Sequence, residues 1–276
     1  MARTAARAVY DTANLKPNFI REINEAFRYR YLIWQLISRN IKIRYKRSFL
    51  GIAWSMLNPL GMMIVMAIVF STIFGRDLNY PVYLLCGLLA WGFFSESSTM
   101  MMNNMIWGSS LLHRIYMPRT AFALSSVGTG LVNLFLAIGP LLLVMLFTGV
   151  PIRSAVLFAP IPIILILMFT LGVGLTLSVG AMYFADISEI FKVVLRAWMY
   201  LTPIIYPESL LFDNGYGWLL RINPMYYLIR VFRGPFQAGV LPSWGEFLPA
   251  FLIAAVSLVL GWLIFTHYSD EFTYRV

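Results

Sequence analysis

Charge, cysteine and histidine are all scarce in this sequence. Only 12% of the 276 residues are charged and 60% are hydrophobic, whereas an average soluble domain is about 25% charged and roughly 45–50% apolar. This imbalance excludes an ordinary soluble domain. The single cysteine, Cys86, excludes an internal disulfide, and two histidines are too few for a Cys/His metal cluster. The composition therefore predicts a polytopic membrane protein.

Motifs for nucleotide binding and for catalysis are missing as well. No glycine is followed directly by a lysine, so the chain has no GxxxxGK[ST] phosphate loop, and HExxH, GxSxG and CxxC are also absent. His113 and His267 fall at the ends of predicted spans, where a structural role is the ordinary one. We therefore expect no catalytic residue, no metal and no cofactor in this chain. If ATP drives the protein, another polypeptide binds it.

Long stretches with little charge predict the membrane spans. A helix needs about 20 apolar residues to cross about 30 Å of hydrocarbon. Five stretches meet this length, and a sixth at 188–206 is weaker because Glu189, Lys192 and Arg196 lie in its first half. We predict an all-α fold with six transmembrane helices, which occupy about 52–75, 80–106, 120–149, 155–184, 188–206 and 246–268.

The basic residues predict the orientation. Eleven Lys and Arg precede residue 54, which places the N terminus in the cytoplasm. With six spans the C terminus is cytoplasmic too, and 16 basic residues lie inside against five outside. A five-span alternative without 188–206 gives 18 inside and three outside, so charge counting leaves both open. The net charge of +9 indicates contact with lipid headgroups rather than with nucleic acid.

The N-terminal segment, 1–50, is predicted to contain an amphipathic helix at 18–47. Phe27, Trp34 and Ile37 recur at helical spacing, while Arg39 and Lys42 fall mostly on the other side. Such a helix lies in the headgroup plane of a membrane. It serves either as an anchor or as a shaped contact surface for a partner. The remainder, 51–276, is predicted to be a single transmembrane domain.

The longest region between predicted spans, 207–245, is apolar and is punctuated by proline and glycine. Two short helices, at about 208–222 and 224–236, are expected in it. Neither is long enough to span, so both should enter the outer leaflet as a re-entrant pair or rest on it. Backbone at that depth has to be buried in protein or line a wet cavity.

Glu96 is the one acidic residue inside a strong predicted span. It shares a helical stripe with Gly92, Thr99 and Asn103, which forms either a hydrated path or a cluster of interhelical hydrogen bonds. Flat aromatic side chains could stack on the sugar rings of a passing chain, although each is also explained by packing. The candidate channel-lining residues are Trp91, Phe94, Glu96, Thr99, Tyr183, Trp198, Tyr200 and Tyr206.

The stretch from Arg39 to Leu60, RNIKIRYKRSFLGIAWSMLNPL, resembles the permease subunits of ABC-type polysaccharide exporters, the Wzm/TagG-like family. SSLLHRIYMPRTAFALS at 109–125, YFADISEI at 183–190, TPIIYP at 202–207 and INPMYYLIRVFRGPF at 222–236 fit the same family. Two departures are visible. His113 stands where the family usually has Lys or Arg, and Ala185 stands where Arg often precedes the Asp.

This resemblance implies the partners and the working parts. It implies a homodimer with its channel at the dimer interface, in a bacterial cytoplasmic membrane, and two copies of a separate ATP-binding subunit that holds ATP and Mg²⁺. The cargo would be a lipid-linked polysaccharide such as O-antigen. The cytoplasmic coupling loop would be 108–119, with His113, Arg114, Tyr116, Pro118, Arg119, Arg44 and Lys46 facing the ATPase. The external gate would contain Asn223, Pro224, Tyr226, Tyr227 and Arg230.

Two other functions stay open at this point. One is an ABC permease for small hydrophobic drugs or lipids, which the 39–60 and 222–236 stretches disfavour. The other is a membrane-embedded enzyme or carrier that acts alone, for which the sequence offers few catalytic groups and a single intramembrane carboxylate.

Overall fold

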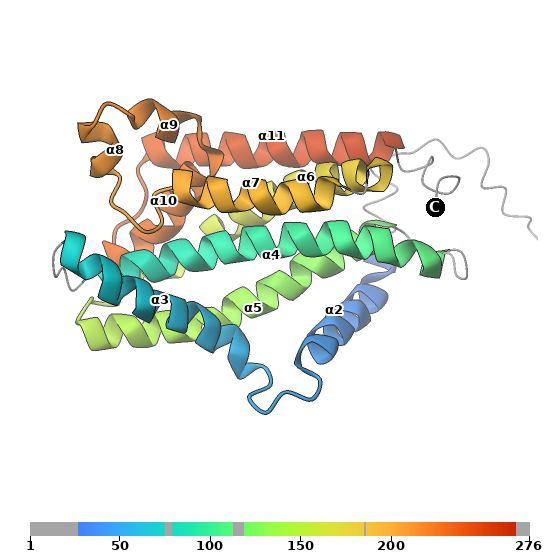
Figure 1. Ribbon diagram of the computed structural model, residues 1–276, viewed down its shortest axis with the longest axis horizontal. Coiled ribbons are helices and arrows are strands. Elements are labelled where there is room, and N and C mark those ends of the chain that lie inside the picture. Colours follow the sequence, from blue (N-terminus) through green and yellow to red (C-terminus); the bar gives the residue numbers. More distant parts are fainter. Residues whose placement is uncertain (1–26, 75–78, 113–118, 185, 269–276) are drawn as a thin grey trace, which may run out of the picture.

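The computed structural model describes residues 27–74, 79–112, 119–184 and 186–268, and these contain helices and no strand (Figure 1). The predicted all-α fold is confirmed for this part of the chain. The elements are α2 (Arg30–Tyr45), α3 (Ala53–Phe74), α4 (Tyr80–Leu112), α5 (Arg119–Thr148), η2 (Ser154–Phe158), α6 (Pro160–Tyr183), α7 (Ile187–Leu201), α8 (Ser209–Asp213), α9 (Gly217–Ile222), α10 (Pro224–Gln237) and α11 (Trp244–Tyr268).

Within the described residues, four stretches are long and apolar enough to cross a membrane: Ala53–Phe70, Arg119–Thr148, Ser154–Tyr183 and Trp244–Tyr268. They overlap four of the six predicted spans, as expected for a multi-pass membrane protein. The other two predicted spans correspond to α4 and α7. Helix α4 has 33 residues but is interrupted by polar side chains, and α7 has 15 residues, about 22 Å of helix. The total of six therefore stays a prediction.

Helix α4 runs through the middle of the molecule, with α3 and α5 on one side and α6, α7 and α11 on the other (Figure 1). Leu84, Leu85 and Cys86 are completely buried, and so are its polar residues Ser97 and Ser98. The hydroxyl of Ser98 donates to the carbonyl oxygen of Phe94 at 2.6 Å. Since the protein itself surrounds much of α4, the helix tolerates polar residues that a lipid-facing helix would not.

Helices α6 and α11 pack in direct backbone contact. A Cβ atom on Gly172 would lie 2.1 Å from the carbonyl oxygen of Ser257, and one on Gly261 would lie 2.1 Å from the carbonyl oxygen of Gly172. Only glycine fits at either position. Close approach at small residues is the usual way to pack helices in lipid, where apolar burial alone gives little driving force.

Helix α2 packs on α5 with only part of the apolar face that its sequence predicts. Ile37 is buried and its Cδ1 lies over Gly128, while the Asn40 amide donates to the Thr129 hydroxyl at 3.3 Å. Trp34, which the prediction places beside Ile37, is 61% exposed. Ile37 therefore packs inward, and Trp34 is left open on the outer side of the helix. Residues 18–26 of the predicted helix lie outside the described part.

The region between α7 and α11 contains three short helices, whereas the sequence predicted two. The expected helix at 208–222 is broken into α8 and α9, because the chain turns at Gly215 with a φ of +78°, a conformation that favours glycine. The second expected helix is present as α10. The three helices gather at one end of the molecule, far from α2 (Figure 1). The predicted coupling loop begins inside α4, which continues to Leu112, and 113–118 lie outside the described residues.

Candidate functional site

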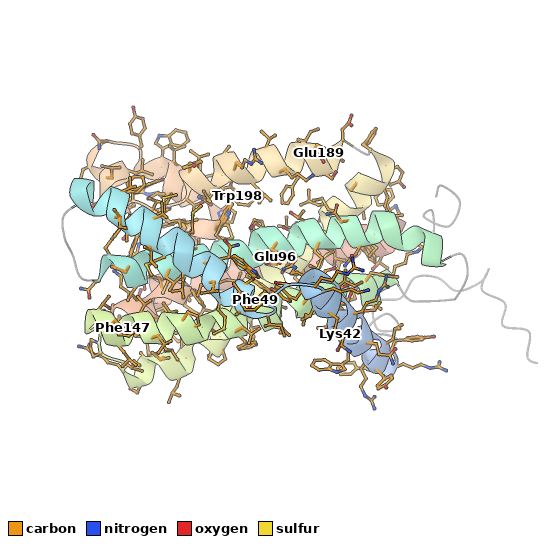
Figure 2. The ribbon with its side chains drawn as sticks, turned by 60° about the horizontal axis from the view of Figure 1, so that its bottom comes forward. Lys42, Phe49, Glu96, Phe147, Glu189 and Trp198 are labelled. Atoms are coloured by element: carbon orange, nitrogen blue, oxygen red, sulfur yellow. The ribbon has the colours of Figure 1, made fainter. Side chains whose placement is uncertain are left out.

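The α4 surface between α3 and α7 borders two hollows that share Arg44, Trp91 and Glu96. The first hollow, of about 610 Å³, lies between α4 and α7. The second, of about 700 Å³, lies between α3 and α4. Figure 2 shows Glu96 near the middle of α4. We call this surface the open face of α4, and its residues are Leu88, Trp91, Gly92, Ser95, Glu96, Thr99, Met100, Asn103 and Asn104.

Glu96 joins three helices at the boundary of the two hollows. The Arg44 guanidinium, from the end of α2, forms a hydrogen-bonded ion pair with the Glu96 carboxylate. The Asn133 amide, from α5, donates to the same carboxylate oxygen at 3.4 Å. The side chains of Arg44 and Glu96 are 34% and 36% exposed. A paired carboxylate that still faces a hollow keeps its charge at lower cost than an isolated one in hydrocarbon.

The predicted channel-lining residues fall into separate groups. Trp91, Glu96 and Thr99 line the hollows. Phe94 is completely buried, so its ring faces the core of this chain instead of a hollow. Tyr183 packs edge-on against Tyr268 with ring centres 5.8 Å apart. Tyr200 is exposed on α7, and the Tyr206 hydroxyl donates to the Tyr200 carbonyl at 2.9 Å. Whether any of them contacts a passing glycan stays a prediction.

Trp198 stands in an aromatic cluster between α4, α6 and α7. Its ring lies edge-on to Trp91, Phe94 and Phe169, with centres 5.8, 5.4 and 6.4 Å away. Edge-on pairs of this kind add about 0.5–1.5 kcal/mol beyond their buried area. The indole N–H donates to the side-chain oxygen of Asn223 at 2.8 Å. Trp198 therefore ties α7 to the start of α10 as well as to the core.

Asn223 is the N-cap of α10 and the most highly bonded of the predicted gate residues. Its side-chain oxygen accepts the Met225 backbone N–H at 3.1 Å, which is the normal capping interaction. Its amide donates to the Thr202 hydroxyl at 2.8 Å and to the Leu201 carbonyl at 3.4 Å. Pro224 follows at the first helical position, where its missing N–H costs nothing. The end of α7 and the start of α10 are thereby held together.

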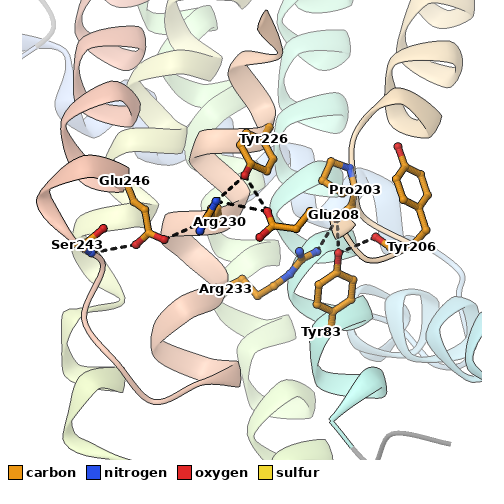
Figure 3. A network of polar contacts seen from close by, with 9 residues as sticks. All are labelled: Tyr83, Pro203, Tyr206, Glu208, Tyr226, Arg230, Arg233, Ser243 and Glu246. Carbon is orange, nitrogen blue, oxygen red and sulfur yellow. Dashed lines mark hydrogen bonds and ion pairs between the residues drawn. The ribbon is translucent and has the colours of Figure 1, made fainter. Parts of the chain in front are cut away.

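Arg230 is the centre of a polar network at the same end of the molecule (Figure 3). Its guanidinium donates to the Tyr226 hydroxyl at 2.5 Å and to the Glu246 carboxylate at 2.9 Å, and it lies 3.5 Å from Glu208. Burial and the hydrogen bond to Glu208 raise the pKa of Tyr226 to about 12, so its hydroxyl stays protonated and donates to Glu208 at 2.8 Å. The network links α10 to α11 and to the segment before α8. Tyr227 stands apart, with its hydroxyl donating to the Arg221 carbonyl at 3.1 Å.

Arg233 and Asn133 were not predicted from the sequence as site residues. Arg233 is buried, its guanidinium lies 3.5 Å above the centre of the Tyr83 ring, and it donates to the Pro203 carbonyl at 3.1 Å (Figure 3). No local signal reveals such a pair, because the ring is 150 positions away in the chain. Asn133 was detectable as an amide inside an apolar span.

The predicted coupling residues are described only in part. His113, Arg114, Tyr116 and Pro118 lie outside the described residues. Arg119 is the first residue of α5 and Lys46 is exposed just after α2. Arg44, predicted to face an ATPase, forms an ion pair with Glu96 in this chain. Its contact with a partner stays untested.

Comparison with known proteins yields a consistent set of relatives. The family model for the ABC-2 type transporter matches residues 31–236. The O-antigen export system permease protein RfbA of Myxococcus xanthus is 34% identical over 260 residues, 92% of this chain and 98% of the relative. A protein of the same name from Klebsiella pneumoniae is 29% identical over 76% of this chain and 82% of the relative. The polysialic acid transport protein KpsM of Escherichia coli is 21% identical over 82% and 89%.

Proposed function

Because this chain belongs to the ABC-2 type transporter family, we propose that it is the membrane subunit of an ATP-driven exporter of a lipid-linked polysaccharide. The substrate would move from the cytoplasmic to the outer side of a bacterial cytoplasmic membrane. The observation that carries this proposal is the similarity to an O-antigen export permease over 92% of this chain and 98% of the relative. A match of that extent covers a whole permease and not one shared segment.

The proposed assembly is a homodimer with two copies of a separate ATP-binding subunit. The missing phosphate loop supports a separate subunit, which would hold ATP and Mg²⁺. The open face of α4 supports the dimer, because the hollows on one chain are unclosed and a second protomer would complete the wall of a path. The cargo would pass along that shared interface.

The proposed topology has six spans, with both termini in the cytoplasm. Helix α4 would be an internal span whose polar side faces the path. Helix α7 would cross together with the non-helical segment that follows it. Helices α8, α9 and α10 would form the external re-entrant region, and the bonds of Asn223 and Arg230 would hold it closed.

The proposed mechanism is conformational coupling without covalent chemistry. Closure of the ATPase pair would press on 108–119, which connects α4 to α5. Those two helices carry Glu96 and Asn133, which are hydrogen-bonded to each other at 3.4 Å. A shift of α4 against α5 would therefore change the position of Glu96 and the shape of the hollows that it lines.

Deletion of the gene in its source organism tests the function. We expect surface polysaccharide to disappear and its lipid-linked form to accumulate on the cytoplasmic side. The wild-type gene should restore export, and Arg114→Glu with Arg119→Glu should fail to restore it although the protein is present in the membrane. Unchanged surface polysaccharide together with a new sensitivity to hydrophobic drugs would instead support a drug or lipid permease.

A further inference from the structure

The first hollow is lined by more cationic than anionic side chains. Arg44, Lys192 and Arg196 border it, and Glu96 is the one acidic residue among its lining. Lys192 and Arg196 are four residues apart on α7, so they lie on the same side of that helix. Arg44 approaches from α2, across the open face of α4. Three positive groups from two helices thus surround one space of about 610 Å³.

These cations differ in how firmly they are held. Arg44 is paired with Glu96, and Lys192 donates to Glu189 at 2.5 Å on the exposed surface of α7. Arg196 is exposed and has no ion-pair partner among the described residues. Exposed ion pairs of this kind are worth at most about 1 kcal/mol. An incoming anion with several oxygens could therefore displace them.

The remaining lining suits a ligand that joins an anion to a sugar. Ser95, Thr99, Asn103 and Asn104 supply hydroxyl and amide groups, and Trp91 supplies an aromatic edge on the same wall. A guanidinium fork matches the oxygens of a phosphate group better than it matches an isolated hydroxyl. Met100, Leu195 and Met199 add apolar surface to the same lining, so the combination fits a phosphate that connects an apolar tail to a glycan.

We infer that this hollow binds the phosphate group of a lipid phosphate through Arg44, Arg196 and Lys192, and that Glu96 occupies Arg44 when the site is empty. The inference rests on the proposed export function and specifies the chemistry of its cargo at the linkage between lipid and glycan. Glu96 is then a competitor for the ligand. Its removal should strengthen binding, whereas a merely structural ion pair would show no such gain.

Binding to the purified full-length chain in dodecyl maltoside, without nucleotide, tests the inference. The probes are geranylgeranyl diphosphate, uncharged geranylgeraniol and inorganic pyrophosphate. We expect Arg44→Gln and Arg196→Gln each to weaken geranylgeranyl diphosphate binding by about tenfold, as the loss of one charge-assisted hydrogen bond predicts. Glu96→Gln should bind it more tightly than wild type. Lys42→Gln is the matched control, because it removes a charge from α2 outside this hollow.

The three probes separate the sources of the phosphate. Pyrophosphate binding with the same variant pattern would support a site for the phosphate group alone, and binding of the lipid form only would support a lipid headgroup site. Equal binding of geranylgeraniol, equal weakening by Lys42→Gln, or weaker binding by Glu96→Gln would overturn the inference. If Arg44→Gln does not fold, Arg196→Gln and Glu96→Gln decide the question. Since no step requires ATP or transport, a negative result here would leave the gene-deletion result unaffected.

Discussion

Asn223 and Glu96 are both polar residues inside an apolar protein, yet their surroundings differ. Asn223 is buried and takes part in four hydrogen bonds, with groups on Trp198, Leu201, Thr202 and Met225. Glu96 is about one-third exposed, contacts Arg44 and Asn133, and faces hollows on two sides. One polar group is fully satisfied within the chain, and the other retains capacity for a ligand.

The same contrast separates two sides of the helical bundle. On the closed side, α6 and α11 meet at Gly172 and Gly261 without room for one methyl group. On the open face of α4, a Cβ atom added to Gly92 would find nothing within 4 Å. Close packing gives one side a single arrangement, while the other side is left free to bind and to move. Substitutions on the tight side or at the outer end should therefore cost more stability than matched substitutions in a looser setting.

The largest expected effect is that of Gly172→Ala. The new methyl group would collide with the backbone of α11, which cannot move without separating the two helices. We expect a loss of about 3 kcal/mol in the free energy of unfolding, measured by titration with sodium dodecyl sulfate in mixed micelles. Gly92→Ala is the control, and alanine there should be neutral or stabilise by up to about 1 kcal/mol. Equal losses for the two substitutions would contradict the difference in packing between the α6–α11 contact and the open face of α4.

Asn223→Ala should have the next largest effect. It removes the cap of α10 and leaves the Trp198 indole N–H without its acceptor, while the Thr202 hydroxyl keeps its bond to the Trp198 carbonyl. We expect a loss of about 2–3 kcal/mol, from the cap and from the unsatisfied indole N–H. Asn214→Ala, at an exposed position after α8, should change stability by less than about 0.5 kcal/mol. If both alanine variants melt at the wild-type temperature, the capping contacts do not hold the outer end together.

The smallest expected effects come from the exposed ion pairs. Arg230→Gln removes contacts with Glu246, Glu208 and Tyr226, and should cost about 1 kcal/mol after allowance for solvent screening. Lys192→Gln removes one contact, to Glu189, and should cost less than about 0.5 kcal/mol. Thermal melts in low and high salt would check both. A larger loss for Lys192→Gln would show that α7 is held more tightly than its exposure indicates.

The long apolar helices were predictable from the sequence, whereas the break between α8 and α9 and the packing of α2 were not. Apolar length alone predicted α3, α5, α6 and α11 to within a few residues. The break between α8 and α9 was missed because it depends on a left-handed turn at Gly215, and several glycines in that region could have supplied one. The packing of α2 against α5 was also not predicted. Its apolar pattern does not distinguish burial against α5 from exposure to lipid headgroups.

Part of the candidate site was predictable in the same way. Glu96 stood out because a carboxylate in an apolar span is expensive, and it does line both hollows. Phe94 was chosen for its aromatic ring and is buried in the core. Arg44 was assigned to an ATPase contact, although in the structure it pairs with Glu96. Neither contact could be predicted from the sequence, because the residues that Phe94 and Arg44 meet lie far away in the chain.

The sequence by itself determined that this is a helical membrane protein, because a membrane-spanning helix needs an apolar run as long as the hydrocarbon core of the bilayer is thick. It also determined that the given sequence contains no GxxxxGK[ST] phosphate loop. Only the tertiary structure decided which polar groups are satisfied and which remain available. The pairs of Arg233 with Tyr83 and of Arg44 with Glu96 join residues 150 and 52 positions apart. Contacts of that range depend on how the helices pack, and helical periodicity within one segment contains no information about them.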